Sequence, residues 1–246
     1  MLLDVKNLSI AYQGKPTVSN VNFDLQAGEI MAIVGESGSG KTSVIRAILG
    51  CLSGNGQVEG GQINFGGRDI AHLNNKEWLS IRGKDIAMIF QDSGNMLNPV
   101  QTIGKQFVEY LQLHSSMSKS EAVEKACSLL TRMNLPDPQR VMESHAFELS
   151  GGMRQRVGIA MALAFAPKLL LADEPTASLD PETARSLFGT ILDMVRTTGI
   201  SALVVTHAPE LIGSGGMLVK HVTAQPGDQP KSSVFDDGEQ SPAGEA

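Results

Sequence analysis

One short stretch limits most strongly what this chain can fold into. Residues Gly35–Thr42 read Gly-Glu-Ser-Gly-Ser-Gly-Lys-Thr, between the apolar run Ile30–Val34 and a segment, Ser43–Leu49, that can form a helix. Glycines in a turn between a buried strand and a helix let successive backbone N–H groups point at phosphate oxygens. Lys41 can supply a positive charge for the β- and γ-phosphates, and the Thr42 hydroxyl can ligate Mg²⁺. The pattern predicts a phosphate-binding loop, and the alternative is a glycine turn that only caps a helix.

Length, charge and cysteine spacing narrow the class of protein. At 246 residues with 41% hydrophobic content, one α/β domain with a small subdomain is expected. The net charge of −6 argues against nucleic acid as the main partner, because phosphate neutralisation needs clustered Lys and Arg. Neither a secretory signal nor an apolar run long enough to span a membrane is visible. Cys51 and Cys127 lack C-x-x-C spacing, so we expect small buried residues in a reducing compartment.

Strand-like and helix-like segments alternate along the chain. Residues 1–34 look rich in strand, and Leu169–Ala172 and Leu203–Thr206 are short apolar strands. Asp180 followed by Pro181 is typical of a helix start. This order predicts a parallel sheet with helices on its faces. Ligands are expected at the carboxyl ends of its strands.

Two segments depart from this alternation. Residues 92–148 read as a helical insertion, in which Ser118 and Glu121 form a capping box before apolar residues at helical spacing. Residues 224–246 are rich in Pro, Gly, Ser, Gln and acids. Such a composition does not offset the entropy lost on ordering. We therefore expect a disordered acidic tail at 224–246.

A second motif, Leu149–Arg156, reads Leu-Ser-Gly-Gly-Met-Arg-Gln-Arg and resembles the signature sequence of ATP-binding-cassette (ABC) ATPases. A Ser-Gly-Gly turn that opens a helix, Met153–Phe165, makes a second anion site; an ordinary helix N-cap is the alternative. The resemblance covers residues 1–210 or so. It implies a head-to-tail dimer, in which Ser150 and Gly152 touch the γ-phosphate held by the partner's phosphate loop.

The resemblance also implies an α/β fold of the P-loop NTPase type. Its expected parts are an ABC-ATPase core, an N-terminal antiparallel β subdomain and an inserted α-helical subdomain. On this interpretation residues 1–91 and 149–223 form the ATP-binding core and residues 92–148 the helical subdomain.

Leu169–Glu174 resembles the Walker B strand of the same family. A buried strand that ends in an acid can hold the acid beside Mg²⁺, directly or through water, which fits Asp173. Glu174 would then orient the attacking water as general base. Two adjacent acids could instead be a solvated helix start before Pro175.

Four further residues take their meaning from the resemblance. Gln91 matches the Q-loop glutamine that senses Mg²⁺, and His207 matches the switch histidine that bonds the γ-phosphate. Asp180 ends the segment Ser178-Leu179-Asp180, which matches the D-loop at the dimer interface, and it also suits a helix N-cap. Tyr12 fits the aromatic residue that stacks on adenine, although an edge-strand tyrosine is also common.

The predicted site contains ATP and Mg²⁺. The expected catalytic residues are Glu174, His207 and Gln91, and the expected metal ligands are Thr42, Gln91 and Asp173. The remaining residues are expected to bind the nucleotide: Tyr12, Gly35, Ser37, Gly38, Ser39, Gly40, Lys41, Thr42, Ser43, Ser150, Gly151, Gly152 and Asp180.

The segment Gln91–Pro99 resembles the Q-loop region of importer ATPases for peptides, nickel and metal-chelator complexes, although Ser93-Gly94-Asn95-Met96 departs from the commoner version. The resemblance implies an ATPase subunit at the cytoplasmic face of the inner membrane. Implied partners are permease subunits, a second ATPase subunit in a heterodimer or homodimer, and indirectly a solute-binding protein. Asn95 and Leu97 are expected to face the permease. The alternative is an ABC ATPase of repair or translation, not coupled to transport.

Overall fold

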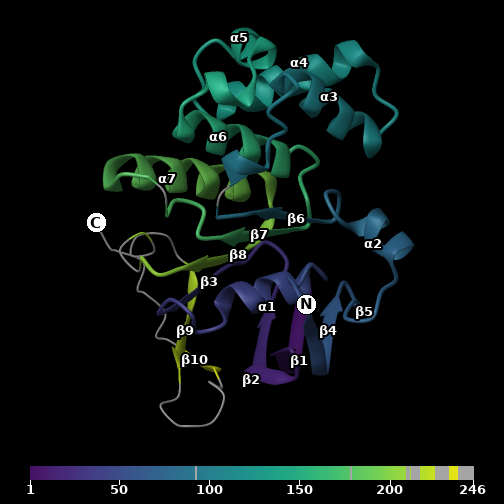
Figure 1. The fold of residues 1–246 in the computed structure, drawn as a ribbon, viewed down its shortest axis with the longest axis vertical. Coiled ribbons are helices and arrows are strands. Elements are labelled where there is room, and N and C mark those ends of the chain that lie inside the picture. The colour runs from purple at the N-terminus through teal and green to yellow at the C-terminus, as the bar shows by residue number, and fades with distance from the viewer. Residues whose placement is uncertain (92, 178, 209–210, 212–216, 225–232, 238–246) are drawn as a thin grey trace. The chain divides into compact units, whose positions relative to one another are not determined.

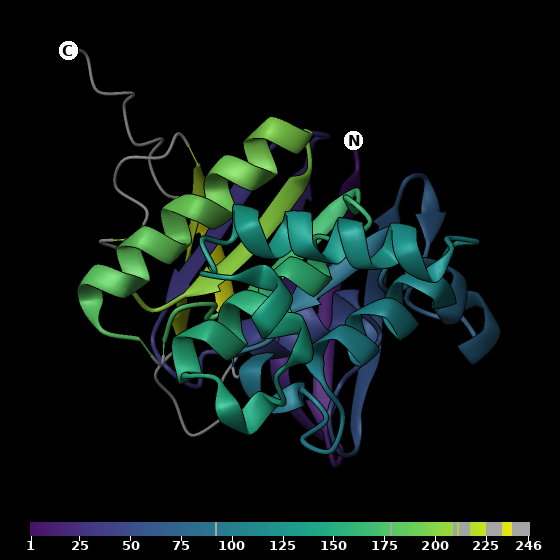
Figure 2. The same cartoon turned by 90° about the horizontal axis from the view of Figure 1, so that it is seen from above.

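The computed structural model describes residues 1–91, 93–177, 179–208, 211, 217–224 and 233–237. The chain forms two compact units, which are described separately. The first comprises residues 1–82, 171–174 and 199–246, and the second comprises residues 83–170 and 175–198. Figure 1 labels the elements, and Figure 2 gives a second view in the same colours.

An antiparallel sheet occupies the N-terminal part of the first unit. Its strands are β1 (Leu3–Tyr12), β2 (Lys15–Leu25), β4 (Gly56–Phe65) and β5 (Arg68–Asp69), in the order β2-β1-β4-β5. In β2 every second residue near the end is buried, which is the pattern of a sheet with one covered face. The predicted antiparallel sheet is confirmed.

The parallel strands of the first unit carry its most apolar sequence. β3 (Ile30–Gly35) pairs in parallel with β8 (Ser201–Thr206) on one side and with β9 (Leu218–Ala224) on the other. The carboxyl end of β7 (Leu169–Asp173) lies next to β8. All residues of β7 and β8 are buried, as expected for strands covered on both faces.

The helices α1 (Lys41–Ile48) and α2 (Asn75–Ile81) belong to the first unit. α1 follows β3 through the glycine loop and packs on β3 and β8. α2 is opened by a capping box between Asn74 and Glu77. The guanidinium of Arg82, directly after α2, donates to the carbonyls of Leu49 and Gly50 at the end of α1.

The second unit is mainly helical. Its described residues form β6 (Ile86–Ile89), the first two residues of β7, the 3₁₀ turns η1 (Ser93–Met96) and η2 (Ala146–Glu148), and five α-helices. The helices are α3 (Ile103–Leu113), α4 (Lys119–Arg132), α5 (Pro138–Glu143), α6 (Gly151–Ala162) and α7 (Pro181–Thr198). The predicted capping box is present, with Ser118 accepting from Glu121 N and Glu121 accepting from Ser118 N.

The fold class is confirmed, and the compact units divide the chain differently from the predicted subdomains. The helices predicted at 92–148 share one unit with β6, α6 and α7. These helices group with α6 because α6 contacts both η1 and α4. The predicted subdomain boundaries remain a prediction.

Five residues of the predicted tail form a strand. β10 (Ser233–Asp237) pairs antiparallel with β9, with Val234 opposite Thr223 and Phe235 opposite Val222. The expectation of disorder therefore fails for these five residues and for Ala224, which ends β9. Val234 and Phe235 favour strand, and a composition averaged over the whole tail conceals them. Residues 225–232 and 238–246 lie outside the described residues.

Two smaller findings complete the fold. Among the residues described above, no helix combines the length and the apolar character needed to cross a bilayer. Cys51 and Cys127 are free thiols that are half-buried, where burial was expected.

Candidate functional site

The glycine loop between β3 and α1 has the backbone that its sequence predicts. Gly38 and Gly40 have φ values of 80° and 94°, in the left-handed region that residues with a Cβ atom rarely adopt. Gly40 is the N-cap of α1 and has no side-chain cap. The first backbone N–H groups of α1 therefore face the loop without a side-chain acceptor, as an anion site at a helix N-terminus requires.

Lys41 lies folded over this loop. Its side chain is only 5% exposed, and Nζ donates to the carbonyl oxygens of Gly35 and Glu36, both at 2.7 Å. Burial lowers the pKa of Lys41, while the carboxylates of Glu174 and Asp173 act in the opposite direction. The ammonium group is thus held where the loop, α1 and the end of β7 meet.

Asp173 ends β7 and is almost fully buried. Its Oδ1 accepts a hydrogen bond from Thr42 Oγ1 at 2.8 Å. Burial raises the pKa of Asp173, and the Thr42 hydrogen bond and the charges of Arg46 and Lys41 oppose that rise. A threonine hydroxyl beside a carboxylate fits Mg²⁺, which takes oxygen ligands and needs only one or two from protein when phosphates supply others.

Arg46 was not singled out by the sequence analysis. It lies one helical turn after Thr42 on α1, and its charge lowers the pKa of Asp173. Its Nε is buried and has no hydrogen-bond partner in the described part of the chain. Spacing of four residues from Thr42 places both on one helix face, and this was the available signal.

Glu174 and His207 form a direct pair in the first unit. Glu174 Oε2 lies 2.5 Å from His207 Nδ1, and because a carboxylate can only accept, Nδ1 is the donor. Glu174 N donates to Val205 O at 2.9 Å, which joins the ends of β7 and β8. Glu174 has a φ of 49°, a left-handed conformation uncommon for a residue other than Gly, Asn or Asp.

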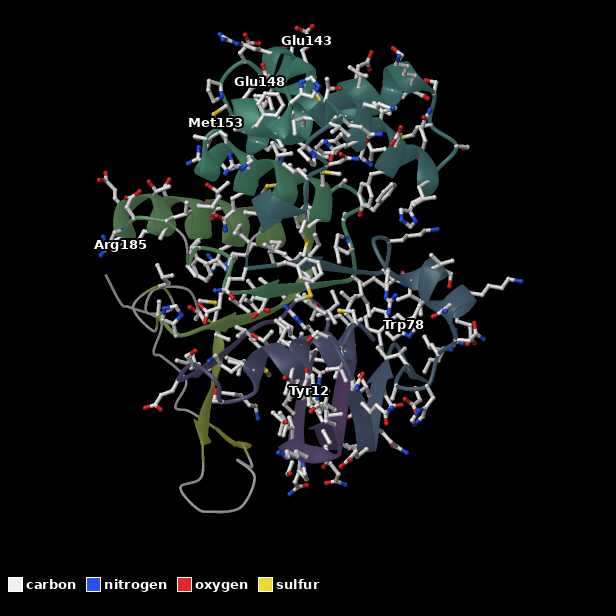
Figure 3. The ribbon with its side chains drawn as sticks, viewed as in Figure 1. Tyr12, Trp78, Glu143, Glu148, Met153 and Arg185 are labelled. Carbon is white, nitrogen blue, oxygen red and sulfur yellow. The ribbon has the colours of Figure 1, made fainter. Side chains whose placement is uncertain are left out.

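Tyr12 lies at the end of β1, and its hydroxyl is 3.2 Å from Ser43 Oγ on α1 (Figure 3). A Cβ atom at Gly56 would lie 2.6 Å from Tyr12 Cε1. Glycine at position 56 therefore leaves room for the ring, a role that the sequence analysis missed. The structure brings Tyr12, the loop, Asp173, Glu174 and His207 into one unit, and stacking on adenine remains a prediction.

The other predicted residues belong to the second unit. Gln91 is exposed and lies two residues after the end of β6. Ser150 is the N-cap of α6, where its Oγ accepts from Met153 N at 3.2 Å, and Gly151 and Gly152 begin that helix. Asp180 accepts from Thr183 N at 3.0 Å. That backbone hydrogen bond lowers the pKa of Asp180.

These hydrogen bonds fit both the capping interpretation and the functional interpretation of Ser150 and Asp180. Each is a helix cap in the structure, and a functional role can coexist with capping. Ser178, the first residue of the predicted D-loop, lies outside the described residues.

Comparisons with known proteins point to one family. A probable peptide ABC transporter ATP-binding protein of Sinorhizobium fredii is 41% identical over 212 residues, a match that covers 84% of this chain and 63% of the relative. The oligopeptide transport ATP-binding protein OppD of Escherichia coli is 42% identical over 210 residues, and the match covers 84% of this chain and 62% of OppD. This chain thus spans less than two thirds of the length of these relatives.

A solved structure agrees with the sequence comparisons. The dimeric structure of a post-hydrolysis state of the ATP-binding cassette MJ0796, bound to ADP and Pi, matches with a TM-score of 0.78 and 29% identity. The match covers 89% of this chain and 94% of that one. The family model described as ABC transporter matches residues 18–177. Loop, signature motif, fold and relatives agree, and the chain belongs to the ABC transporter family.

Proposed function

We propose that this chain is the ATP-hydrolysing subunit of an importer and that it energises peptide uptake through a partner permease. The observation that supports hydrolysis best is the arrangement at the ends of β7 and β8. There the Thr42–Asp173 hydrogen bond and the Glu174–His207 pair stand beside the buried ammonium group of Lys41. An ordinary helix cap requires none of these groups.

Each residue has a distinct task in the proposed reaction. The loop N–H groups and Lys41 bind the β- and γ-phosphates and balance charge that develops on them. Thr42 and Asp173 would hold Mg²⁺, which when bound neutralises the phosphate oxygens. Glu174 orients the attacking water and accepts its proton. His207 fixes the Glu174 carboxylate through Nδ1 and can contact the γ-phosphate with the rest of its ring.

We further propose that the complete site needs a second ATPase chain. Ser150, Gly151 and Gly152 offer a helix N-terminus to phosphate, and the related cassette structure is described as dimeric. In the proposed dimer, these residues of one chain complete the site around the phosphate loop of the other, and Gln91 contributes to Mg²⁺ binding. Asp180 lies at the same interface.

Peptide as the cargo is suggested by the two relatives, which are described as a peptide and an oligopeptide transport protein. Nickel and metal-chelate complexes were also expected from the resemblance of Gln91–Pro99. Neither relative is described in those terms, so peptide is the cargo that we propose. A solute-binding protein would deliver it to the permease.

The permease contact is proposed at two exposed segments of the second unit. Met96, Val100 and Phe147 are 62%, 81% and 71% exposed. The segments run side by side, because Thr102 pairs with His145 in an isolated bridge. Leu97, which was expected to face the permease, is only 8% exposed, and nothing is described for the Asn95 side chain.

Two measurements test this function. First, the chain is assembled with the permease and any sister ATPase in vesicles, where we expect Mg-ATP hydrolysis that a peptide-loaded binding protein stimulates. Second, single cysteines at Met96 and Val100 are expected to crosslink to cytoplasmic loops of the permease. A cysteine at Lys76, exposed in the first unit, is the control. Hydrolysis that peptide does not stimulate, with no crosslink from Met96 or Val100, would contradict the transport role and favour an uncoupled ATPase.

A further inference from the structure

A cleft of about 790 Å³ lies among α3, α4 and α5 of the second unit. Figure 1 shows these three helices together at the end of the unit farthest from β6. The volume is within the usual range for small-ligand sites, about 300–1,000 Å³. The cleft contains none of the predicted nucleotide-binding residues, so the proposed ATPase chemistry gives it no task.

The floor of the cleft is apolar and its mouth is charged. Val108 of α3, Val123 and Cys127 of α4 and Met142 of α5 form the apolar part. Val108 and Met142 are buried, and Val123 and Cys127 are half-buried. An apolar floor with a few charged groups at its edge is the usual form of a site for an amphipathic molecule.

The two ends of the cleft have opposite charge. At one end Gln112 Nε2 donates to Met117 O, which places the carboxyl end of α3 beside Lys119, the first residue of α4. At the other end Ile103 N donates to Ser144 O, which places the start of α3 beside Glu143.

Neither Lys119 nor Glu143 has an ion-pair partner among the described residues. By contrast, Lys105 and Glu109 at the edge pair with each other at 3.8 Å. Lys119 also stands at the positive end of the α4 dipole, which the carboxyl end of α3 beside it partly offsets. A bound molecule can therefore place its negative end at Lys119 and its positive end at Glu143.

The distance between the two charged ends of the cleft limits the size of the ligand that can reach both. The stretch of α3 that lines the cleft runs from Gly104 to Gln112, and eight steps of helical rise span about 12 Å. An extended tripeptide measures about 10–11 Å. Its α-carboxylate and α-ammonium groups lie at opposite ends, and apolar side chains between them match the floor.

From this match we propose that the α3–α4–α5 cleft binds short, free-ended apolar peptides, with the carboxylate at Lys119 and the ammonium group at Glu143. The choice of peptide as the biological ligand rests on the proposed function. The cleft would allow the ATPase to sense imported peptide on its own side of the membrane. Binding itself needs no nucleotide, so it can be measured whether or not the chain hydrolyses ATP.

Cys127 gives a direct readout, because its thiol lines the cleft and that of Cys51 does not. The purified full-length chain is treated with iodoacetamide at mildly alkaline pH, and alkylation of each cysteine is followed by mass spectrometry. We expect millimolar trileucine to slow alkylation of Cys127 severalfold and to leave Cys51 unchanged. Equal protection of both thiols, or no protection of Cys127 at 10-fold higher peptide, would overturn the proposal.

Blocked peptides and charge-neutral variants test the orientation. An exposed ion pair changes affinity by about two- to fivefold, so N-acetylation of trileucine and Glu143→Gln should each weaken protection by that factor. The two changes together should weaken it no further, because they remove the same contact. C-amidation of trileucine and Lys119→Gln should likewise each weaken protection by that factor, and the two together should weaken it no further.

Matched controls are Glu124→Gln, exposed on α4, and Lys76→Gln, exposed on α2, and neither should change protection. Equal binding of free and doubly blocked trileucine would show that the cleft takes any apolar chain and would refute the proposed ligand. Loss of ATP hydrolysis with intact peptide protection would count against the proposed function alone. Normal ATP hydrolysis without any peptide protection of Cys127 would count against the peptide site alone.

Discussion

At the scale of single residues, Glu174 has the most direct test. In Glu174→Gln the amide oxygen can still accept from His207 Nδ1, but the side chain can no longer take a proton from water. We expect ATP binding to be retained and hydrolysis to be slower by about 10²–10⁴-fold. Single-turnover hydrolysis in the assembled ATPase measures the rate. Glu59→Gln, an exposed change on β4 of the same unit, is the control, and near-normal turnover of Glu174→Gln would remove Glu174 from the role of base.

Asp173 provides a prediction with a defined dependence on pH. Because folding raises the pKa of this carboxyl through burial, the folded chain takes up the proton more readily than the unfolded chain does. Ionised Asp173 therefore reduces stability above the ordinary pKa of an aspartate, and this cost disappears as the pH falls below it.

Asp173→Asn removes the buried charge and keeps an acceptor for Thr42 Oγ1. Without nucleotide at neutral pH, we expect a higher melting temperature, since each 1 kcal/mol corresponds to about 2–4 °C in a chain of this size. The gain should vanish on acidification through the raised pKa. Mg²⁺-dependent ATP binding should fall in the same variant. A lower melting temperature at neutral pH would show that Asp173 is held by stronger charge pairing than its surroundings indicate.

The local conformation of two predicted motifs follows from their own residues, while the binding roles of those residues remain predictions. The glycine loop needs left-handed backbone at Gly38 and Gly40, and Ser150 needs only the next turn of α6 to act as a cap. Prediction from sequence missed Gly56, whose lack of a side chain leaves room for Tyr12 from another strand. No spacing within one element indicates such an approach, because it depends on how strands pair.

At the scale of elements, the contact of Arg82 with the end of α1 is the feature most open to test. Arg82 donates to the terminal carbonyls of Leu49 at 3.0 Å and Gly50 at 2.5 Å. Its guanidinium also lies 4.6 Å from the centroid of the Trp78 ring. Helix ends leave such carbonyls without partners. One side chain from after α2 therefore fixes the helix that begins at the phosphate loop.

Arg82→Lys should destabilise the first unit by about 1–2 kcal/mol, since an ammonium group keeps the charge but cannot reproduce the two directed bonds. Urea unfolding measures the change. Arg68→Lys is the matched control, because Arg68 pairs with Glu77 at the surface and should cost less than about 1 kcal/mol. Equal urea midpoints of unfolding for the two variants would mean that the Arg82 hydrogen bonds do not stabilise the end of α1.

The positions of helices and strands could be predicted where a single local sequence pattern determines them. The capping box at Ser118 located the start of α4, and uninterrupted apolar runs located β3, β7 and β8. The prediction was weaker where pairing decides. β4 begins at Gly56, where it pairs with Tyr12 at the end of β1, and β10 forms because it pairs with β9. Leu97 was expected at the surface and is buried, since a short polar stretch does not reveal which side chain faces the core.

At the scale of the whole molecule, the decisive question is whether one site draws on two chains. Within one chain the phosphate loop and its acids belong to the first unit, and the Ser150–Gly152 turn belongs to the second. If a second copy supplies the turn, two different inactive variants should restore one another. An intrachain site predicts no such rescue, because each variant would then lack part of its only site.

Lys41→Ala removes the loop cation, and Gly152→Asp places a negative charge where phosphate would approach the start of α6. A Cβ at Gly152 has room, since the nearest atom, Leu179 Cδ2, is 3.8 Å away. An acid in the first helical turn is also favourable, so loss of activity would not reflect unfolding. Each variant alone should be inactive as a homodimer. Their equimolar mixture should regain about a quarter of the normal rate, since half of the dimers carry one intact site of two.

A sister ATPase in place of a second copy gives a different pattern in the same assay. Each variant is then inactive without the sister, the mixture stays inactive, and sedimentation with Mg-ATP shows a dimer only when the sister is added. Lys41→Ala would abolish hydrolysis at its own loop, and Gly152→Asp would abolish it at the loop of the sister. A monomer that hydrolyses ATP at the full rate, with Gly152→Asp as active as the unmodified chain, would contradict both forms of the composite site.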